Sequence, residues 1–273
     1  DTGLQPWIII NEIHRRRVEP NTYPSGVEKR YGADTEGRKT YDSYHELMLL
    51  ARSTMATNLA NTKGGFFIDM HGHGHTYANK HEEEYTSPVN GKKALSTYIQ
   101  QSEIGYALSN ETLEQPDNEL DKMATYSSIY AIAKAHPEQP FSQLIRGPYS
   151  LGALLDDEGS VAVPGKLIPV LERDAVRFGR DKNGNPERRP YFSGGFLSRK
   201  YGTAAKPPYP HGVIGFADNI SSVQIETPGL TVRRTEDVRA RSAHQFKRAI
   251  IKYLNHWYGY DFPNSAYPYQ YYK

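Results

Sequence analysis

Three short runs of apolar residues along the chain have the length of buried β-strands. They cover residues 7–11, 65–70 and 222–226, and each is followed by a polar or glycine-containing stretch. Strands that are buried on both faces read as continuous apolar runs rather than as alternating ones. The pattern therefore predicts three strands of a mostly parallel sheet.

Amphipathic helices are predicted between and after these strands. One is expected over residues 41–60, ahead of the second strand, and another opens at Thr235, after the third. The helix that opens at Thr235 has acidic residues in its first turn and basic residues toward its end, as the helix dipole favours. A further helix is expected over residues 119–135.

Alternation of buried strands with amphipathic helices is typical of an α/β fold. We expect one layered domain over residues 1–273, with a mixed, mostly parallel central sheet and helices on both faces. The stretches at residues 76–102 and 177–210 are rich in Gly, Pro, Asn and Lys. Loops of that length usually carry function, and the second contains a hairpin-type turn at residues 181–184.

Composition and charge narrow the classes of partner. The 273 residues carry a formal net charge of +2, and no apolar run approaches the roughly 20 residues that cross a bilayer. Neither nucleic acid nor a membrane is therefore the expected partner. The absence of cysteine excludes thiolate sites, so any metal must be held by His and carboxylates. Sequons at Asn110 and Asn219 permit an extracellular location, which the sequence leaves open.

The most informative segment ends the second predicted strand with Asp69, His71, His73 and His75. Alternate side chains of a strand share a face, and α/β proteins bind ligands beyond the carboxyl ends of their strands. Imidazoles are common zinc ligands, and a neighbouring carboxylate can orient them. The pattern predicts a zinc site with Asp69, His71 and His73. The alternative is that these histidines only satisfy backbone groups in a glycine-rich turn.

Other charged residues also follow predicted strands. Glu226 ends the third strand, where an unpaired carboxylate is costly, so it either pairs with an arginine or acts as a general base. Arg15 follows the first strand and is suited to a carboxylate or a developing oxyanion, although adjacent arginines often form a solvated surface. Arg146 lies in a Gly- and Pro-containing loop that could reach the same rim.

These segments resemble the N-formylglutamate amidohydrolase-like family, which is related to zinc carboxypeptidases and to the aspartoacylase and succinylglutamate desuccinylase group. The resemblance implies a phosphorylase/hydrolase-like fold with one catalytic zinc. The motifs that carry it run over most of the chain and are Asp69-Met-His71, Ile225-Glu-Thr-Pro228, Arg15 with Val18-Glu-Pro-Asn21, Tyr44-His45, Glu103-Ile-Gly-Tyr106, Arg146-Gly-Pro-Tyr-Ser-Leu-Gly152 and Tyr191-Phe-Ser-Gly-Gly195.

By matching positions, the resemblance implies a role for each residue of the candidate site. His71 would be a zinc ligand with Asp69 behind it, and Glu226 would be the general base. Arg15 would polarise the scissile carbonyl or bind a substrate carboxylate, with Asn21 beside it. The family takes its first zinc ligands from a segment before the strand at residues 7–11. The resemblance therefore implies a missing N-terminal segment, a metal held by His71 with His73 and His75, or a catalytically inactive relative.

Two hypotheses of different classes follow. The first is a zinc-dependent amidohydrolase or carboxypeptidase-like enzyme, which cleaves an amide next to a carboxylate in an N-acyl or N-formyl amino acid or at a peptide end. Glu226 and Arg15 would be catalytic, and Asn21 and Arg146 would bind substrate. The second is a non-catalytic binding or structural protein that reuses the same fold. Both depend on His71 and Glu226 meeting across adjoining strands.

Overall fold

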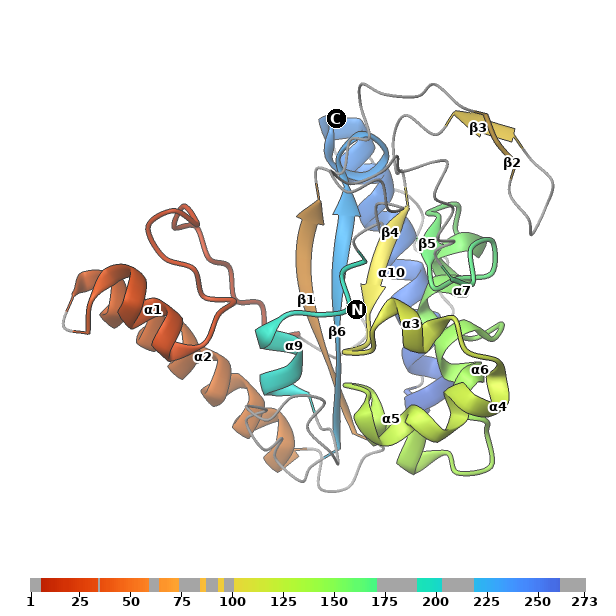
Figure 1. Cartoon of the computed structure of the whole chain (residues 1–273), viewed down its shortest axis with the longest axis horizontal. Coiled ribbons are helices and arrows are strands. Elements are labelled where there is room, and N and C mark those ends of the chain that lie inside the picture. The colour runs from red at the N-terminus through yellow and green to blue at the C-terminus, as the bar shows by residue number, and fades with distance from the viewer. Residues whose placement is uncertain are drawn as a thin grey trace, which may run out of the picture.

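The computed structural model describes residues 6–33, 35–58, 64–73, 84–86, 93–95, 101–170, 191–202 and 219–260. A mixed sheet lies at the centre (Figure 1), and its strand order is β1 (Gly65–His73), β6 (Ile220–Pro228), β4 (Ser102–Gly105) and β5 (Ala162–Val163). β1 pairs with β6 and β4 pairs with β5 in parallel, whereas β6 and β4 are antiparallel. The predicted α/β fold with a mixed, mostly parallel sheet is confirmed. A separate hairpin pairs β2 (Glu84–Thr86) with β3 (Lys93–Leu95).

Helices cover both faces of the sheet. The long helix α10 packs on one face, and the short helix α9 lies on the other (Figure 1). None of the helices in the described ranges is long and apolar enough to span a bilayer. The helical elements are α1 (Pro24–Tyr31), α2 (Glu36–Asn58), α3 (Asn110–Leu113), α4 (Asp117–Leu120), the 3₁₀ helix η1 (Asp121–Tyr126), α5 (Tyr130–Ala135), α6 (Phe141–Arg146), α7 (Leu151–Asp157), α9 (Phe196–Tyr201), the π-helix η2 (Gly229–Arg233) and α10 (Glu236–Tyr258).

The alternation of side chains along β1 separates an apolar face of the sheet from a polar one. Phe66 and Ile68 pack into the main core beneath α10. Phe67 points the other way and packs against a smaller cluster that contains Met48 of α2 and Tyr201 of α9. Because a strand repeats every two residues, the odd-numbered positions that follow Phe67 share its face.

Both predicted strands that the structure contains are longer than expected, and the helix ahead of β1 begins earlier than expected. β1 continues to His73, β6 extends the run at 222–226 in both directions, and α2 begins before residue 41. Thr235 caps α10 as predicted, since its side chain accepts a hydrogen bond from the backbone N–H of Val238.

The helix predicted over residues 119–135 is wrong, because the segment is broken at Ser127. The Ser127 hydroxyl donates to the Tyr106 carbonyl and accepts from the backbone N–H of Ile129. The Ser128 hydroxyl donates to the Ser222 carbonyl at 2.6 Å, which ties the break to β6. Serine side chains that bond to backbone groups in this way compete with helical hydrogen bonds.

The strand predicted at residues 7–11 is also wrong. This segment has no regular secondary structure, and Ile8 and Ile10 are each 73% exposed. Only Ile9 packs against the small cluster around Met48. The loops predicted at 76–102 and 177–210 lie partly outside the described residues, and the turn at 181–184 lies wholly outside them. The first of these predicted loops contains the β2–β3 hairpin, and the second contains α9.

Candidate active site

The parallel register of β1 and β6 places His71 directly opposite Glu226 and Asp69 opposite Gln224. Paired residues on neighbouring strands point to the same face, so these four side chains lie together on the face that α9 covers. His71 Nδ1 is 3.9 Å from Glu226 Oε1. The predicted meeting of this imidazole and this carboxylate across adjoining strands is confirmed, and it lies at the carboxyl ends of both strands.

A second carboxylate flanks the same imidazole. Asp69 Oδ1 is 3.0 Å from His71 Nε2, and the Asp69 side chain is only 9% exposed. The other oxygen, Asp69 Oδ2, is buried and has no hydrogen-bond partner among the described residues. His71 is thus held between two acidic groups, one on its own strand and one on the neighbouring strand.

Burial and charge act in opposite directions on these groups. Burial lowers the pKa of His71, but its hydrogen bond with Asp69 and the charges of Asp69 and Glu226 outweigh burial and raise the pKa overall. Burial raises the pKa of Glu226, and the charge of His71 and a hydrogen bond from Gln224 only partly oppose it. The pKa of each group is therefore raised, that of His71 by its acidic neighbours and that of Glu226 by burial.

The coil after residues 7–11 brings Arg15, Glu19 and Asn21 to this face. Arg15 Nε donates to the carboxylate of Glu19, which also accepts from the backbone N–H of Asn21 at 3.1 Å. Asn21 Nδ2 lies 3.3 Å from His71 Nε2, and Asn21 Oδ1 accepts from the backbone N–H of Leu197. Asn21 therefore connects the coil, α9 and His71.

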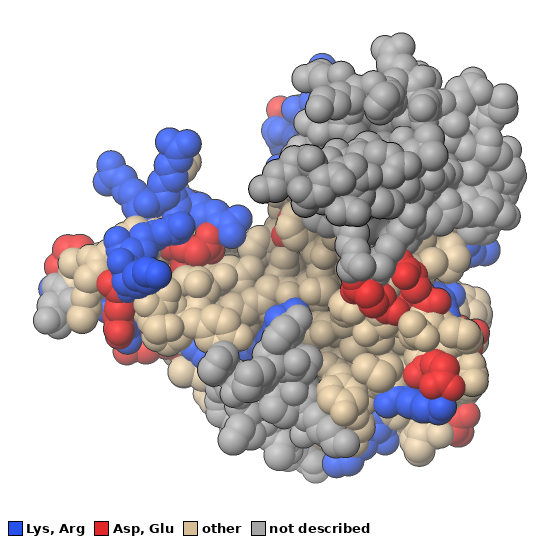
Figure 2. Space-filling model, viewed as in Figure 1, with Lys and Arg blue, Asp and Glu red and all other residues tan. Residues whose placement is uncertain are grey.

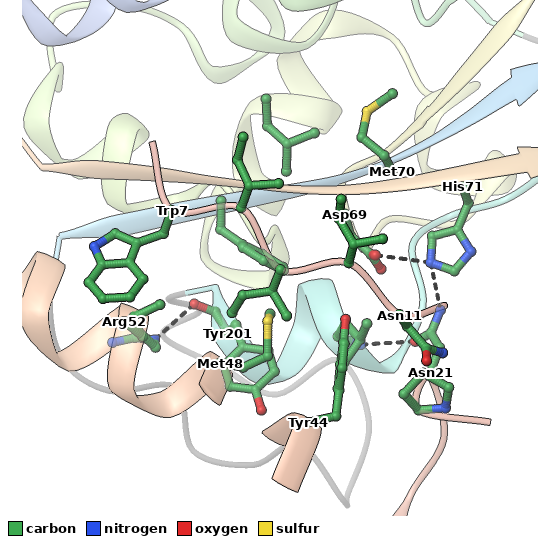
Figure 3. Close-up of a pocket in the computed structure, with 18 of the residues that line it drawn as sticks. Trp7, Asn11, Asn21, Tyr44, Met48, Arg52, Asp69, Met70, His71 and Tyr201 are labelled. Atoms are coloured by element: carbon green, nitrogen blue, oxygen red, sulfur yellow. Dashed lines mark hydrogen bonds and ion pairs between the residues drawn. The ribbon is translucent and has the colours of Figure 1, made fainter. Parts of the chain in front are cut away.

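A cavity of about 750 Å³ opens beside these residues. Asn11, Asn21, Asp69 and His71 lie toward one end of it, and Trp7 lies toward the other (Figure 3). Arg15 also lines the cavity, whereas Glu226 does not line it and contacts His71, which does.

Two predicted residues lie elsewhere. Arg146 donates to Asp117 and to the carbonyl of Leu113, so the structure does not bring it to the cavity. His73 shares the face of His71, but its Nε2 is 3.1 Å from the Gln101 carbonyl oxygen. His75 lies outside the described residues. His73 therefore contacts a backbone group, which is what the alternative interpretation of the histidines predicted.

The described residues alone do not fit a zinc ion. The unpartnered Oδ2 of Asp69 is an atom that a cation would satisfy. Within the described ranges, however, no group of three or more His, Asp and Glu side chains is arranged to hold a metal.

Three polar residues of the site had no predicted role. Gln224 donates to Glu226 Oε1 at 2.8 Å and accepts from the backbone N–H of Gly195. Gln224 lies two residues before Glu226 on the same strand, so the sequence alone places both side chains on one face and could have identified Gln224 as a neighbour of Glu226. Glu103 on β4 is fully buried and pairs in register with Glu226, but only the antiparallel β4–β6 pairing reveals this. Glu19 contacts Arg15 within one coil segment.

The fold and the site define an α/β protein with a histidine between two carboxylates at one end of a cavity. No family model, curated protein or solved structure matches the chain.

Proposed function

We propose that this chain is a hydrolase that cleaves an amide bond next to a carboxylate, as in an N-acyl amino acid or at a peptide end. The observation that carries the proposal is the His71–Glu226 contact at 3.9 Å, at the carboxyl ends of two parallel strands and beside a cavity. Ligands of α/β proteins bind at this edge, and hydrolysis needs a group that can accept and return a proton.

In the proposed reaction, the His71–Glu226 pair takes a proton from the attacking water as the water oxygen bonds to the amide carbon. The pair returns a proton to the leaving nitrogen when the carbon–nitrogen bond breaks. Arg15 stabilises negative charge on the carbonyl oxygen or binds the substrate carboxylate, because its guanidinium lines the same cavity. Asp69 and Asn21 hold the imidazole ring in place.

Membership of the N-formylglutamate amidohydrolase-like family and a catalytic zinc remain proposals. Both derive from the sequence motifs, and zinc would need ligands beyond the described residues. Elemental analysis of the purified protein tests the metal: about one zinc per chain would support it, and protein that hydrolyses substrate without zinc would contradict it.

A conservative substitution at Glu226 tests the hydrolase. Glu226→Gln keeps the shape of the side chain and an acceptor for Gln224, but it removes the carboxylate that accepts a proton. We expect hydrolysis of N-acyl amino acids to fall by about 100-fold or more with an unchanged circular dichroism spectrum. The matched control is Glu119→Gln, which changes a carboxylate paired with Lys122 outside the cavity. Equal turnover in the two variants would exclude Glu226 from the mechanism.

A non-catalytic binding protein is the second candidate. Two observations favour it: Glu226 does not line the cavity, and the described residues contain no metal-binding group. Saturable binding of N-acyl amino acids by the wild-type protein, without any hydrolysis over hours, would select this function over the first.

A further inference from the structure

The cavity beside His71 is far larger than a formyl or acetyl amide requires. Its volume of about 750 Å³ lies in the upper part of the range for sites that enclose whole small molecules. Most of the residues that line it are apolar, and they come from the N-terminal coil, α2, β1 and α9. The cavity therefore has room for a substantial apolar group beyond the polar cluster.

The polar groups around His71 gather at one end of this cavity, and the lining beyond them is mostly apolar, apart from Arg52, whose Nε donates to the Tyr201 carbonyl. Figure 3 shows Asp69, His71 and Asn21 together at one end and Trp7 near Arg52 at the other. Along β1, Phe67 lies four residues before His71, which is roughly 13 Å of strand. The apolar residues that line the cavity include Trp7, Ile9, Met48, Ala51, Met55 and Phe67.

The charge near the polar end is suited to an anionic head group. Arg15 lines the cavity, its side chain is 72% exposed, and only its Nε has a side-chain partner among the described residues. Further basic residues are exposed on the neighbouring coil and on α1, where blue atoms gather in Figure 2: Arg16, Arg17, Lys29 and Arg30. Glu19 and Asp69 also line this end, so the cationic contact open to an anionic group there is the Arg15 guanidinium beyond its bond to Glu19, and an apolar group is favoured at the other end.

From this polarity we infer that the substrate class is the N-acyl amino acids with a long acyl chain. This inference rests on the proposed function and specifies its substrate. The amide would lie at His71, the carboxylate at Arg15, and the acyl chain would extend along β1 toward Trp7. Each methylene that enters the cavity should tighten binding about fourfold, because apolar surface leaves water.

Binding of N-alkylsulfonyl-L-alanines with methyl, butyl and octyl chains tests this inference, because their sulfonamide bond replaces the scissile amide and resists hydrolysis. Of the two tryptophans, Trp7 lines the cavity and is 56% exposed, whereas Trp257 is buried in the core. The fluorescence of Trp7 should shift to shorter wavelength on binding, and Trp7→Phe should remove that shift. We expect the octyl compound to bind at least tenfold more tightly than the butyl compound.

Filling the apolar end should remove the dependence on chain length. Ala51→Phe places a ring in that part of the cavity, so the octyl compound should bind no more tightly than the butyl compound, while binding of the methyl compound is retained. The matched control is Leu50→Phe, because Leu50 is exposed, lies on the same helix and does not line the cavity. This control should retain the preference for the octyl chain.

Wild-type protein alone decides the inference, even if Ala51→Phe fails to fold. Equal affinity for the three compounds, or binding of none of them, would overturn it. These measurements involve no turnover. A preference for the octyl compound without hydrolysis of N-acyl amino acids would refute the proposed reaction and support the proposed acyl-chain site. Hydrolysis without this preference would support the reaction and refute the acyl-chain site.

Discussion

At the scale of single residues, the environment of each histidine determines what its imidazole can do. His71 lies between Asp69 and Glu226, so its charged form is favoured. His45 lies among groups that suit its neutral form: the Pro20 carbonyl accepts from its Nε2, and the Tyr201 hydroxyl donates to its Nδ1 at 2.6 Å. The same residue type is therefore suited to proton transfer at one position and to structure at the other.

Removing the charge of Asp69 should lower the pKa of His71. Burial alone lowers this pKa, and the hydrogen bond and charge of Asp69 are the main effects that raise it. In an NMR titration of the imidazole C–H signals, we expect the His71 midpoint above 6.5 in the wild type and lower in Asp69→Asn. Asp117→Asn, which removes the carboxylate that pairs with Arg146, should leave the midpoint in place. An unshifted midpoint in Asp69→Asn would contradict the pairing.

His45 should make the fold less stable in mild acid. Burial, and then the charge of Lys200, lower the pKa of His45 to about 4. Between pH 6.5 and 4 the unfolded chain binds a proton that the folded chain does not, so the free energy of unfolding must fall as the pH falls. We expect a loss of roughly 1 to 3 kcal/mol in urea unfolding over this window. The loss in His45→Gln should be smaller than in the wild type by this amount, and the same slope in both proteins would contradict the assignment to His45.

At the scale of elements, the strands and long helices follow from periodicity and from end signals. α10 begins at a threonine cap with acidic residues in its first turn, and it ends at Gly259 in the left-handed conformation. These local signals do not depend on the rest of the fold. The same kind of reading was wrong at residues 119–135, where serine hydroxyls bond to backbone groups of β6 and of Tyr106.

The Thr235 cap of α10 should make a measurable contribution to the free energy of unfolding. Thr235→Ala removes the acceptor for the backbone N–H of Val238, and we expect the free energy of unfolding to fall by about 1 kcal/mol. Thr40→Ala provides the comparison, because Thr40 lies inside α2 and alanine is a better helix former there. Its unfolding free energy should stay within a few tenths of a kcal/mol of the wild type or rise. Equal losses in the two variants would show that the cap contributes nothing of its own.

At the scale of the whole molecule, the site and its cavity are assembled from distant parts of the chain. The N-terminal coil, α2, β1 and α9 all line the cavity, although β1 and α9 are separated by more than a hundred residues of sequence. Side chains from three strands, His71, Glu226 and Glu103, also come into one row through strand pairing. Variants that loosen the sheet should therefore affect the cavity as well.

A carboxylate after α7 joins that helix to α10. The buried side chain of Glu158 bonds to Arg248, and its Oε1 accepts from Lys252 at 2.6 Å. Burial raises the pKa of Glu158, but the hydrogen bonds and charges of Lys252 and Arg248 lower it overall. The stability that Glu158 gains from its ion pairs with Lys252 and Arg248 is therefore present above pH 4.5 and is lost as the pH falls further.

Glu158→Gln should lower the free energy of unfolding by about 1 kcal/mol at low salt, and by less at 1 M salt. The neighbouring variant Asp157→Asn is the control, because Asp157 and its partner Lys166 are both largely exposed. Urea unfolding at two salt concentrations measures both effects. A larger loss in Asp157→Asn than in Glu158→Gln would contradict the role of Glu158.

The sequence by itself determined the α/β class, the strands that carry His71 and Glu226, and the helix that Thr235 caps. Each depends on local periodicity or on an end signal. The tertiary structure alone decided that the apolar run at residues 7–11 is not a strand, because a strand forms only where the backbone pairs with a neighbouring strand, and this segment pairs with none of the described strands. It also decided that Arg146 bonds to Asp117 and that Gln224 and Glu103 join Glu226. Those contacts depend on which strands and helices become neighbours, and this in turn depends on how the whole chain packs.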